Sequence, residues 1–213
     1  MFVAQRMTAN PFTVTSGSSV PEAQEVMASH GVRHLPVVDD GAVVGVISKN
    51  DIRAALPSQA TTLSAQEATY LVSKLRVGKV MSKPAVVISP EALLEEAAVL
   101  MRDNKIEILP VVEDGALVGV ITESDLLDSF IDIMGFRDPG TRLTIEAKDQ
   151  PGVLATLTGI TANHHANIQH LAVHRGLLDT SVVIVGVNTP NTEDIEADLE
   201  AAGMRVLGRL VNG

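Results

Sequence analysis

The most informative absence in this 213-residue sequence is cysteine, of which there is none. Disulfides, thiolate metal sites and cysteine nucleophiles are therefore excluded together. Aromatic residues are scarce too, because four Phe, one Tyr and no Trp stand in a chain that is 46% apolar. We therefore expect a core made almost entirely of aliphatic side chains.

Positive charge is the second deficit. The chain has 16 Lys and Arg against 26 Asp and Glu, a net charge of −10. A field of this sign repels nucleic acid phosphates and anionic lipids, so we predict neither nucleic acid nor a membrane as a partner. No apolar run approaches the roughly 20 residues of a membrane span, and the N-terminal segment lacks the apolar region of a signal peptide. We expect a cytoplasmic protein.

Catalytic and metal-binding patterns are missing as well. The sequence contains no P-loop, no G-x-G-x-x-G, no H-E-x-x-H and no G-x-S-x-G, and we find no nucleophile paired with a base. The six histidines lack the spacing and the carboxylate partners of a metal site. We therefore predict no enzyme activity, no metal and no bound cofactor.

What the chain does contain is an internal repeat. A shift of 74 residues places Met7 on Met81 and Asp51 on Asp125. It also places "LPVVDDGAVVGVI" on "LPVVEDGALVGVI". Agreement of this extent indicates the duplication of a structural unit.

Each copy has the same expected elements. A short strand, 12–15 or 85–88, precedes a helix with apolar residues at helical spacing. A hairpin with an Asp-Gly turn follows, and its second strand, "VVGVI" or "LVGVI", is apolar throughout and should be buried on both faces. Ser48 or Thr122 then opens another helix, so each unit reads β-α-β-β-α. A connecting helix is expected at 64–75, after the polar stretch "PSQATTLS".

The Ser/Thr-x-x-Asp pattern after each hairpin, Ser48 to Asp51 and Thr122 to Asp125, has two interpretations. A hydroxyl at the N-cap with an acid three residues later forms a capping box, which stabilises the start of a helix. The same helix N-terminus offers free N–H groups to an anion, and the carboxylate can accept hydrogen bonds from two vicinal hydroxyls, as on a ribose. Capping boxes usually carry Glu or Gln, so Asp in both copies favours a nucleotide site. Both interpretations stay open.

The doubled pattern "LPVV…DG…VGVI-[ST]-x-x-D" resembles a pair of CBS motifs, the Bateman module, over residues 1–135. The resemblance implies a regulatory ligand, either an adenine nucleotide (AMP, ADP or ATP) or S-adenosylmethionine. It also implies that each Asp binds ribose, that the Ser or Thr lies near the phosphates and that adenine lies in an apolar slot. The residues that match are Asp51, Ser48, Lys49, Arg33, His34, Leu35, Pro36, Thr13 and Val14 in the first copy, and Asp125, Thr122, Ile108, Leu109, Pro110, Val86 and Val87 in the second.

The two copies differ in charge. Lys49 follows Ser48 and Arg33 precedes the first "LPV", whereas Glu123 and Glu107 occupy the matching positions of the second copy. A Lys beside a helix N-terminus strengthens anion binding and a Glu weakens it. We therefore expect no polyphosphate at the second site, which would take an adenosine with little charge, S-adenosylmethionine or nothing. Because the motifs of such a module pack about a pseudo-twofold axis, it stays open whether Lys49 contributes its charge to the first site or to the neighbouring one.

The C-terminal third follows the linker "FRDPGT" and orders its strands and helices as βαββαβ. This order predicts a ferredoxin-like domain. RNA-recognition motifs share that plan, but they need surface aromatics and basic charge, which this segment lacks. We place this domain at 141–213 and the tandem unit at 1–135, divided into motif 1 (about 1–60), the connecting helix (about 64–75) and motif 2 (about 77–135).

Within this domain, the turn "DQPGVL" and the later "ANI" resemble an ACT domain. The resemblance implies an amino acid bound at a dimer interface by Asp149, Gly152, Val153, Leu154, Asn167 and Ile168. Gly152 would let a ligand approach the backbone, but Asp and Pro before it also begin any helix well, and many ACT domains only dimerise. A domain of about 70 residues buries little surface by itself, so we expect a homodimer.

These assignments predict an α+β fold: two β-α-β-β-α CBS motifs related by a pseudo-twofold, then a ferredoxin-like βαββαβ ACT domain. The architecture resembles AcuB-type acetoin utilization proteins, a bacterial family of small regulators. It implies a non-catalytic sensor of an adenine nucleotide and an amino acid, with rearrangement absorbed near Gly135–Gly140. The alternative is a structural module that dimerises and docks on a partner enzyme without binding nucleotide.

Overall fold

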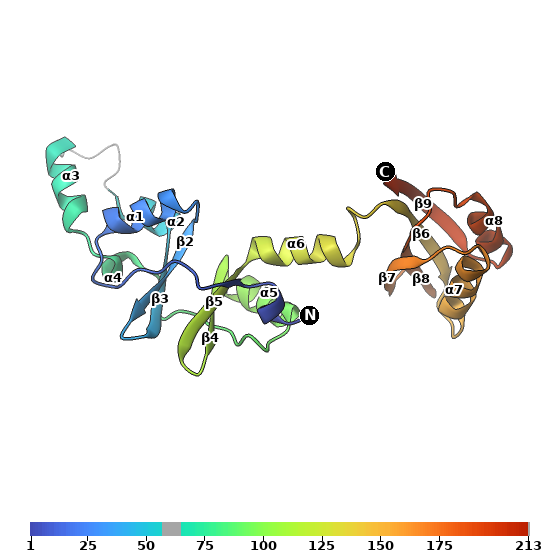
Figure 1. Cartoon of the computed structure of the whole chain (residues 1–213), viewed down its shortest axis with the longest axis horizontal. Helices are drawn as coiled ribbons and strands as arrows, with labels where there is room; N and C mark the ends of the chain where they lie inside the picture. Colours follow the sequence, from blue (N-terminus) through green and yellow to red (C-terminus); the bar gives the residue numbers. More distant parts are fainter. Residues whose placement is uncertain (57–64, 213) are drawn as a thin grey trace. The chain divides into compact units, whose positions relative to one another are not determined.

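The computed structural model describes residues 1–56 and 65–212 and divides the chain into two compact units, Met1–Leu127 and Asp128–Gly213 (Figure 1). The buried hydrophobic residues of both units are aliphatic, as the scarcity of aromatic residues predicts. The mixed α+β fold is confirmed. The polar stretch 57–64, including the expected first residue of the connecting helix, lies outside the described residues.

The first unit contains two β-hairpins with helices around them. It opens with the 3-10 turn η1 (Val3–Gln5), and its strands are β1 (Thr8–Ala9), β2 (His34–Asp39), β3 (Ala42–Ser48), β4 (Ile108–Glu113) and β5 (Ala116–Thr122). Its helices are α1 (Val20–Ser29), α2 (Lys49–Ala55), α3 (Ala65–Lys74), α4 (Val77–Val80) and α5 (Leu94–Asn104), followed by α6 (Glu123–Ile133), which continues into the second unit. Both hairpin turns place Asp and Gly at positive φ, the conformation that an Asp-Gly pair adopts most readily.

The first strand expected in each copy is wrong in length. Residues 12–15 form a single parallel bridge, Val14 with Val37, and residues 85–88 form the equivalent bridge, Ile88 with Val111. Pairing ends there because the chain turns at once: the backbone N–H of Thr15 donates to the hydroxyl of Ser18 rather than to a strand.

The expectation that the second hairpin strand is buried on both faces is wrong for β3. Gly45 and Ile47 are buried, whereas Val44 and Val46 are only half-buried. Both faces of β3 are apolar for different reasons. One face packs on the core, and on the other face Val46 borders a cleft.

The two copies exchange their leading segments. Val3 is fully buried in the core of the second copy, and β1 pairs with β5. Val77, its equivalent, is fully buried in the core of the first copy, where Ser82 bridges to Val46 of β3. Each motif is therefore completed by residues that lie in the other copy's stretch of sequence.

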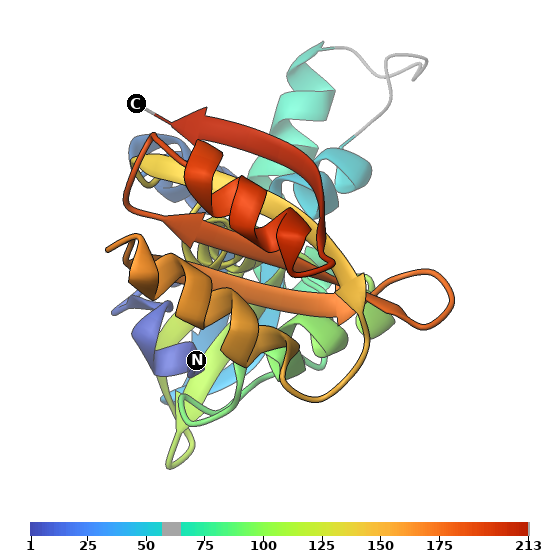
Figure 2. The ribbon, with the colours of Figure 1, turned by 90° about the vertical axis from the view of Figure 1, so that its right-hand side faces the viewer.

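The second unit is a four-stranded antiparallel sheet in the order β7-β8-β6-β9. Its elements are β6 (Gly140–Lys148), α7 (Val153–Asn163), β7 (Ile168–Arg175), β8 (Thr180–Val187), α8 (Glu193–Ala201) and β9 (Arg205–Asn212), which confirms the βαββαβ order. Figure 2 shows both helices across the same face of the sheet. Alternate residues of β6 and β8, such as Leu143, Ile145 and Val183, are fully buried under them.

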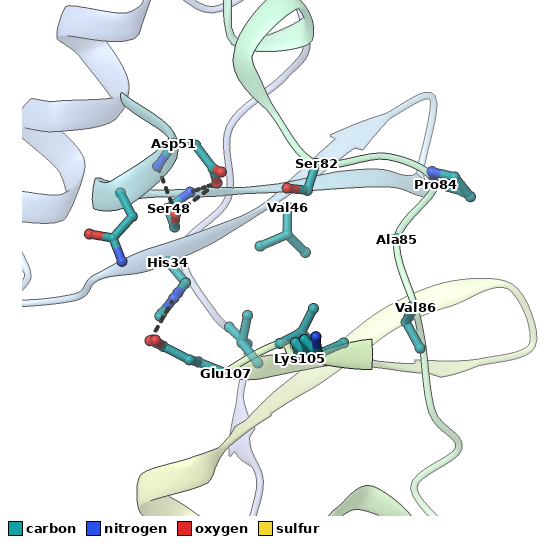
Figure 3. Close-up of a pocket in the computed structure, with 13 residues that line it drawn as sticks. His34, Val46, Ser48, Asp51, Ser82, Pro84, Ala85, Val86, Lys105 and Glu107 are labelled. Carbon is teal, nitrogen blue, oxygen red and sulfur yellow. Dashed lines mark hydrogen bonds and ion pairs between the residues drawn. The ribbon is translucent and has the colours of Figure 1, made fainter. Parts of the chain in front are cut away.

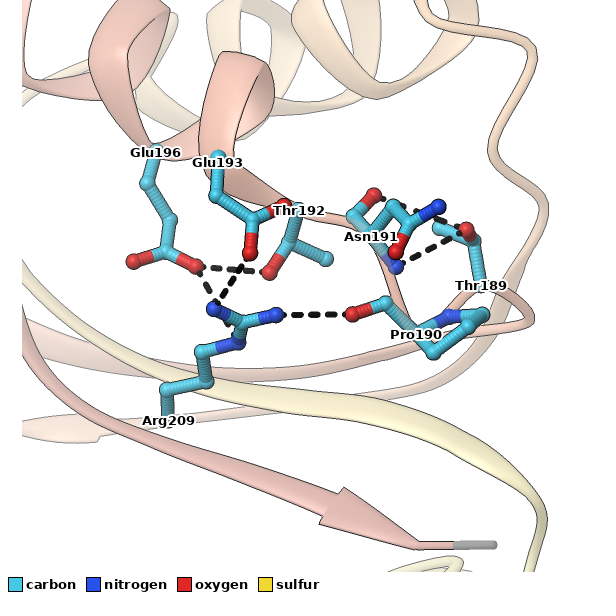
Figure 4. Close-up of polar contacts among 7 residues, drawn as sticks. All are labelled: Thr189, Pro190, Asn191, Thr192, Glu193, Glu196 and Arg209. Atoms are coloured by element: carbon cyan, nitrogen blue, oxygen red, sulfur yellow. Dashed lines mark hydrogen bonds and ion pairs between the residues drawn. The ribbon is translucent and has the colours of Figure 1, made fainter.

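Arg209 of β9 fastens the beginning of α8 to the sheet (Figure 4). Its guanidinium lies 2.8 Å from Oε1 of Glu193 and donates to the carbonyl oxygen of Pro190 at 2.7 Å. The Glu196 carboxylate, 3.6 Å away, also accepts a hydrogen bond from the Thr192 hydroxyl. The backbone amide of Glu193, and then Arg209, lower the pKa of the Glu193 carboxyl, so its charge also complements the N-terminus of α8.

Candidate functional site

Two clefts of the first unit, both lined by described residues, each contain one of the repeated Asp residues. The Asp51 cleft has a volume of about 220 Å³. Figure 3 shows Asp51 and Ser48 on one side of it and Lys105, Glu107 and Val86 on the other. The cleft is lined by His34, Val46, Ser48, Asn50, Asp51, Ser82, Pro84, Ala85, Val86, Lys105, Ile106, Glu107 and Ile108.

Asp51 forms the capping box of α2 with one of its two carboxylate oxygens. Oδ2 accepts hydrogen bonds from the backbone N–H of Ser48 at 2.8 Å and from the Ser48 hydroxyl at 2.7 Å. The backbone N–H of Asp51 donates in return to the Ser48 hydroxyl at 3.0 Å. Among the described residues, Oδ1 accepts no hydrogen bond. Capping and ligand binding are therefore compatible at this residue, because the cap leaves an acceptor in the cleft.

His34 lies opposite this box and pairs with Glu107 across the copies. Nε2 of His34 is 3.4 Å from Oε2 of Glu107, and its side chain is only 13% exposed. Burial lowers the pKa of His34, and the Glu107 carboxylate partly offsets this effect. Lys105, at the end of α5, brings a positive charge to the same cleft.

The Asp125 cleft is larger, with a volume of about 670 Å³. Oδ2 of Asp125 accepts from the backbone N–H and from the hydroxyl of Thr122, both at 2.7 Å, so the capping box is repeated. The lining consists of Thr8, Ala9, Asn10, Pro11, Phe12, Gly31, Val32, Arg33, His34, Leu35, Pro36, Glu107, Ile108, Val120, Thr122, Glu123, Ser124, Asp125 and Leu127.

The structure brings together only part of each nominated set, because every cleft combines both copies. Asp51, Ser48 and His34 share their cleft with Val86 and Ile108 of the second copy. Arg33, Leu35 and Pro36, nominated beside Asp51, instead line the Asp125 cleft with Thr122 and Ile108. The residues nominated from the sequence that line neither cleft are Thr13, Val14, Lys49, Val87, Leu109 and Pro110.

Two opposite reasons keep this last group out. Val14 and Leu109 are directed into the cores of their copies, whereas Lys49 and Val87 are exposed outside both clefts. The charge difference between the sites is therefore carried by other residues than Lys49. Lys105 faces Asp51, and Glu123 faces Asp125 together with Arg33.

Several lining residues were not predicted from the sequence: Asn50, Ser82, Pro84, Ala85, Lys105, Phe12 and the segment 8–11. Their common property is that most belong to the exchanged leading segments. The repeat alignment places Thr8 on Ser82 and Gly31 on Lys105, so it indicates that these positions are equivalent in the two copies. Their place in the clefts can be predicted only once the pairing of β1 with β5 is known.

In the second unit, the six residues nominated for an amino acid are not brought together within one chain. Asp149, Gly152, Val153 and Leu154 follow the end of β6, where Lys148 pairs with Thr180. Asn167 and Ile168 stand at the opposite end, where Ile168 pairs with Val187. An eight-residue strand spans roughly 23 Å, so the two groups are far apart. Gly152 does have a positive φ of 95° and open space around it.

None of the helices in residues 1–56 and 65–212 is long and apolar enough to cross a bilayer. In these same ranges, no three His, Asp or Glu side chains gather in a way that could hold a metal ion.

Comparison with known families finds matches in both units. The CBS domain model matches residues 3–58 and 77–132, and the ACT domain model matches residues 141–203. The CBS domain-containing protein YhcV of Bacillus subtilis is 31% identical over 142 residues, which are 67% of this chain and 92% of YhcV. An inosine-5'-monophosphate dehydrogenase of Korarchaeum cryptofilum is 31% identical over 140 residues, but these are only 26% of that enzyme.

Three solved structures resemble the first part of the chain. AcuB of Vibrio cholerae, described as an acetoin utilization protein, has a TM-score of 0.53 and 30% identity, covering 65% of this chain and 96% of AcuB. The CBS pair of MJ0100, solved with 5-methylthioadenosine and S-adenosyl-L-methionine, has a TM-score of 0.52 and 28% identity, covering 61% and 95%. CBSX2, solved with AMP, has a TM-score of 0.52 and 30% identity, covering 62% and 97%.

Proposed function

This chain belongs to the CBS-domain family and carries two CBS domains followed by an ACT domain, and from this premise we propose that it is a non-catalytic regulatory sensor of an adenosyl ligand. The ligand occupies the Asp51 cleft, where Asp51 holds the ribose. The Ser48 hydroxyl and Lys105 lie where phosphates would be held. This assignment moves the positive charge from Lys49 to Lys105.

One observation carries the proposal. The Asp51 carboxylate uses Oδ2 to cap the helix, and Oδ1 has no partner among the described residues. Asp51 lies at the wall of a cleft. A carboxylate that only capped a helix would need no cleft beside it. The two hydrogen bonds to Oδ2 hold the carboxylate in place, so Oδ1 is well placed to accept a hydrogen bond from a ribose hydroxyl.

The comparisons support the class of ligand. One similar CBS pair was solved with AMP, and another with 5-methylthioadenosine and S-adenosyl-L-methionine. The match to a dehydrogenase covers about a quarter of that enzyme, which favours a role as an accessory domain rather than a catalytic one. Adenosine is the chemistry that these ligands share.

The test is a thermal melt with AMP, ADP, ATP and S-adenosylmethionine at millimolar concentration. A ligand that binds only the folded state stabilises it by RT ln(1 + [L]/Kd), about 2.7 kcal/mol at one hundred times Kd. We expect such a shift in the unmodified protein. Asp51→Ala should lose the shift caused by ATP, because the Asp125 cleft is not proposed to hold a polyphosphate. The control is Glu22→Ala, because Glu22 forms an equivalent capping box with Ser19 on α1 but lines neither cleft.

The two interpretations of the Asp then separate cleanly. Glu22→Ala and Asp51→Ala should each lower stability by about 0.5–2 kcal/mol, the usual cost of a lost cap. Only Asp51→Ala should lose the shift caused by ATP. If none of the four ligands moves the melt of the unmodified protein, the sensor is refuted and the docking module without nucleotide takes its place.

The Asp125 cleft is proposed to take an adenosyl ligand without a polyphosphate. Glu123 and Glu107 add negative charge beside Asp125, and Arg33 supplies one positive charge. S-adenosylmethionine, with its sulfonium, fits this balance better than ATP. Asp125→Ala should therefore reduce the shift caused by S-adenosylmethionine more than the shift caused by ATP.

The ACT domain is proposed to complete an amino-acid site only in a homodimer, since one chain separates Gly152 from Asn167. The homodimer is supported by half-exposed apolar residues on the edge strands, among them Leu171, Val173 and Val211. Light scattering after gel filtration tests the dimer, and calorimetric titration with amino acids tests the site. We further propose a cytoplasmic location. The likeness to AcuB supports a link to acetoin utilization, and growth of a deletion strain on acetoin tests that link.

A further inference from the structure

Three residues line both clefts of the CBS pair: His34, Glu107 and Ile108. We call them the shared wall. His34 and Glu107 contact each other within it, with 3.4 Å between Nε2 and Oε2. This contact therefore borders both clefts.

The shared wall is symmetric in backbone and asymmetric in chemistry. His34 pairs with Ser48 in its hairpin, and Ile108 pairs with Thr122 at the equivalent place in the other. A symmetric wall would present two imidazoles or two isoleucine side chains. Instead it presents one imidazole and, from the other copy, the carboxylate of Glu107. Each cleft thus borders the same titratable pair from a different side.

His34 responds to charges in both clefts. Burial lowers its pKa most, Glu107 opposes this, and Arg33 lowers it further. Asp51 of one cleft and Glu123 of the other both raise it. An anion placed in either cleft would act on the imidazole in the same direction as these carboxylates.

Building on the proposed function, we propose that the His34–Glu107 pair couples the two clefts, so that an anionic ligand in the Asp51 cleft weakens binding of a second anionic ligand in the Asp125 cleft. A phosphate beside Asp51 draws the His34 imidazole away from the Glu107 carboxylate. The freed carboxylate of Glu107 then adds its charge to Glu123 in the Asp125 cleft. A cationic adenosyl ligand there is favoured by the same event, and the coupling is reciprocal by thermodynamic linkage.

The experiment is calorimetric titration of AMP into the full chain, into Asp51→Ala and into Asp125→Ala. Asp51→Ala gives the affinity of the Asp125 cleft alone, and Asp125→Ala gives that of the Asp51 cleft alone. The coupling factor is the ratio of these affinities to the stepwise affinities of the unmodified protein. We expect the second AMP to bind about fivefold more weakly than the isolated cleft does, the low end of usual allosteric couplings. With AMP already bound, S-adenosylmethionine should bind more tightly than without it.

The deciding variant is Glu107→Gln, with its coupling factor measured within its own background. The factor should fall toward one, because the amide brings no charge to the Asp125 cleft. Glu113→Gln is the matched control: it removes the same charge from the exposed end of β4, outside both clefts, and should leave the factor unchanged.

The outcomes separate this inference from the function beneath it. If neither cleft binds any adenosyl ligand, the sensor itself fails. If both clefts bind with a factor of one, or if Glu107→Gln keeps the factor of the unmodified protein, the coupling is overturned and the sensor stands. Binding at one cleft alone overturns the coupling as well.

Discussion

Nε2 of His170 lies 2.5 Å from Oδ2 of Asp138, and Nδ1 of the same ring lies 3.1 Å from the carbonyl oxygen of Ile133. Asn212 of β9 adds a hydrogen bond to the carbonyl oxygen of Phe136 at 2.8 Å. These bonds hold residues 133–138 onto β7 and β9. The segment expected to absorb rearrangement near Gly135 is thus fastened to the ACT sheet.

Replacement of Gly135 by Ala should release this fastening. Gly135 has a φ of 59°, and an added Cβ would lie 1.9 Å from Cδ2 of His170. We expect Gly135→Ala to lose about 1–3 kcal/mol of stability and to speed amide hydrogen exchange in 133–138. Gly159→Ala is the control, because Gly159 lies in α7 and an added Cβ there would meet no heavy atom within 4 Å outside the backbone of its own helix turn. This substitution should stabilise the protein by about 0.5–1 kcal/mol. Unchanged exchange in 133–138 would contradict the prediction.

The stability of the protein should fall in mild acid because of His34. Its folded-state pKa lies below the ordinary value of 6.5, so in this region the unfolded chain binds more protons than the folded one. Stability contributed by the neutral ring is present above about pH 6.5 and is lost as pH falls from there toward the folded-state pKa. Urea unfolding at pH 8 and pH 5.5 should show this, and His34→Gln should reduce the difference.

The control for this measurement is His174→Gln. His174 is exposed, and within the described part of the chain its ring forms a hydrogen bond only with the carbonyl oxygen of Arg175. It should keep the pH dependence of the unmodified protein. An equal reduction in both variants would show that the effect is not specific to His34.

Loss of the Arg209 guanidinium should cost more than loss of an exposed arginine on the same strand. Arg209 donates to the Pro190 carbonyl oxygen and to the Glu193 carboxylate, with its side chain 32% exposed. Arg205 pairs with Glu146 at 2.5 Å, but its side chain is 70% exposed. We expect about 1–3 kcal/mol for Arg209→Ala and below about 1 kcal/mol for Arg205→Ala by urea unfolding. Equal losses would contradict the role given to Arg209.

The two central glycines of the hairpin strands should tolerate Ala to different degrees. At Gly45 an added Cβ would lie 2.8 Å from the carbonyl oxygen of Ser82, which is backbone and cannot move cheaply. At Gly119 the backbone of Thr8 is 3.1 Å away, and the closest atom is the flexible Met7 sulfur at 2.6 Å. We expect Gly45→Ala to cost about 1–3 kcal/mol by thermal unfolding and Gly119→Ala less. The reverse order would disprove this assignment.

The order of elements was predictable from the sequence because it follows local patterns. The Asp-Gly turns marked both hairpins, and the strand and helix patterns of the C-terminal third marked its βαββαβ order. The capping boxes at Ser48 and Thr122 were also visible, since they need only residues three apart. Interactions over short separations leave their signal in the sequence.

The membership of each cleft was not predictable, because it depends on pairing between distant segments. Arg33 is adjacent to His34 in sequence, yet it lines only the Asp125 cleft, whereas His34 lines both. Lys105 reaches Asp51 only because the two copies face each other. The Asp residues were nominated through their pattern, and their surroundings required the tertiary fold. The boundaries 1–135 and 141–213 and the roles of the site residues stay predictions.

The exchange of leading segments has a consequence for how such a chain can arise. A single copy, taken as residues 1–60, lacks the segment with Val77 that fills its core, and it carries the segment with Val3 that fills another. Two separate copies could complete themselves only by trading these segments, which is domain swapping. The duplicated chain holds such a swapped pair within one polypeptide. The segment with β1 can pair with β5 only after more than one hundred further residues have been made. Of the two CBS motifs, the second is therefore completed later during synthesis.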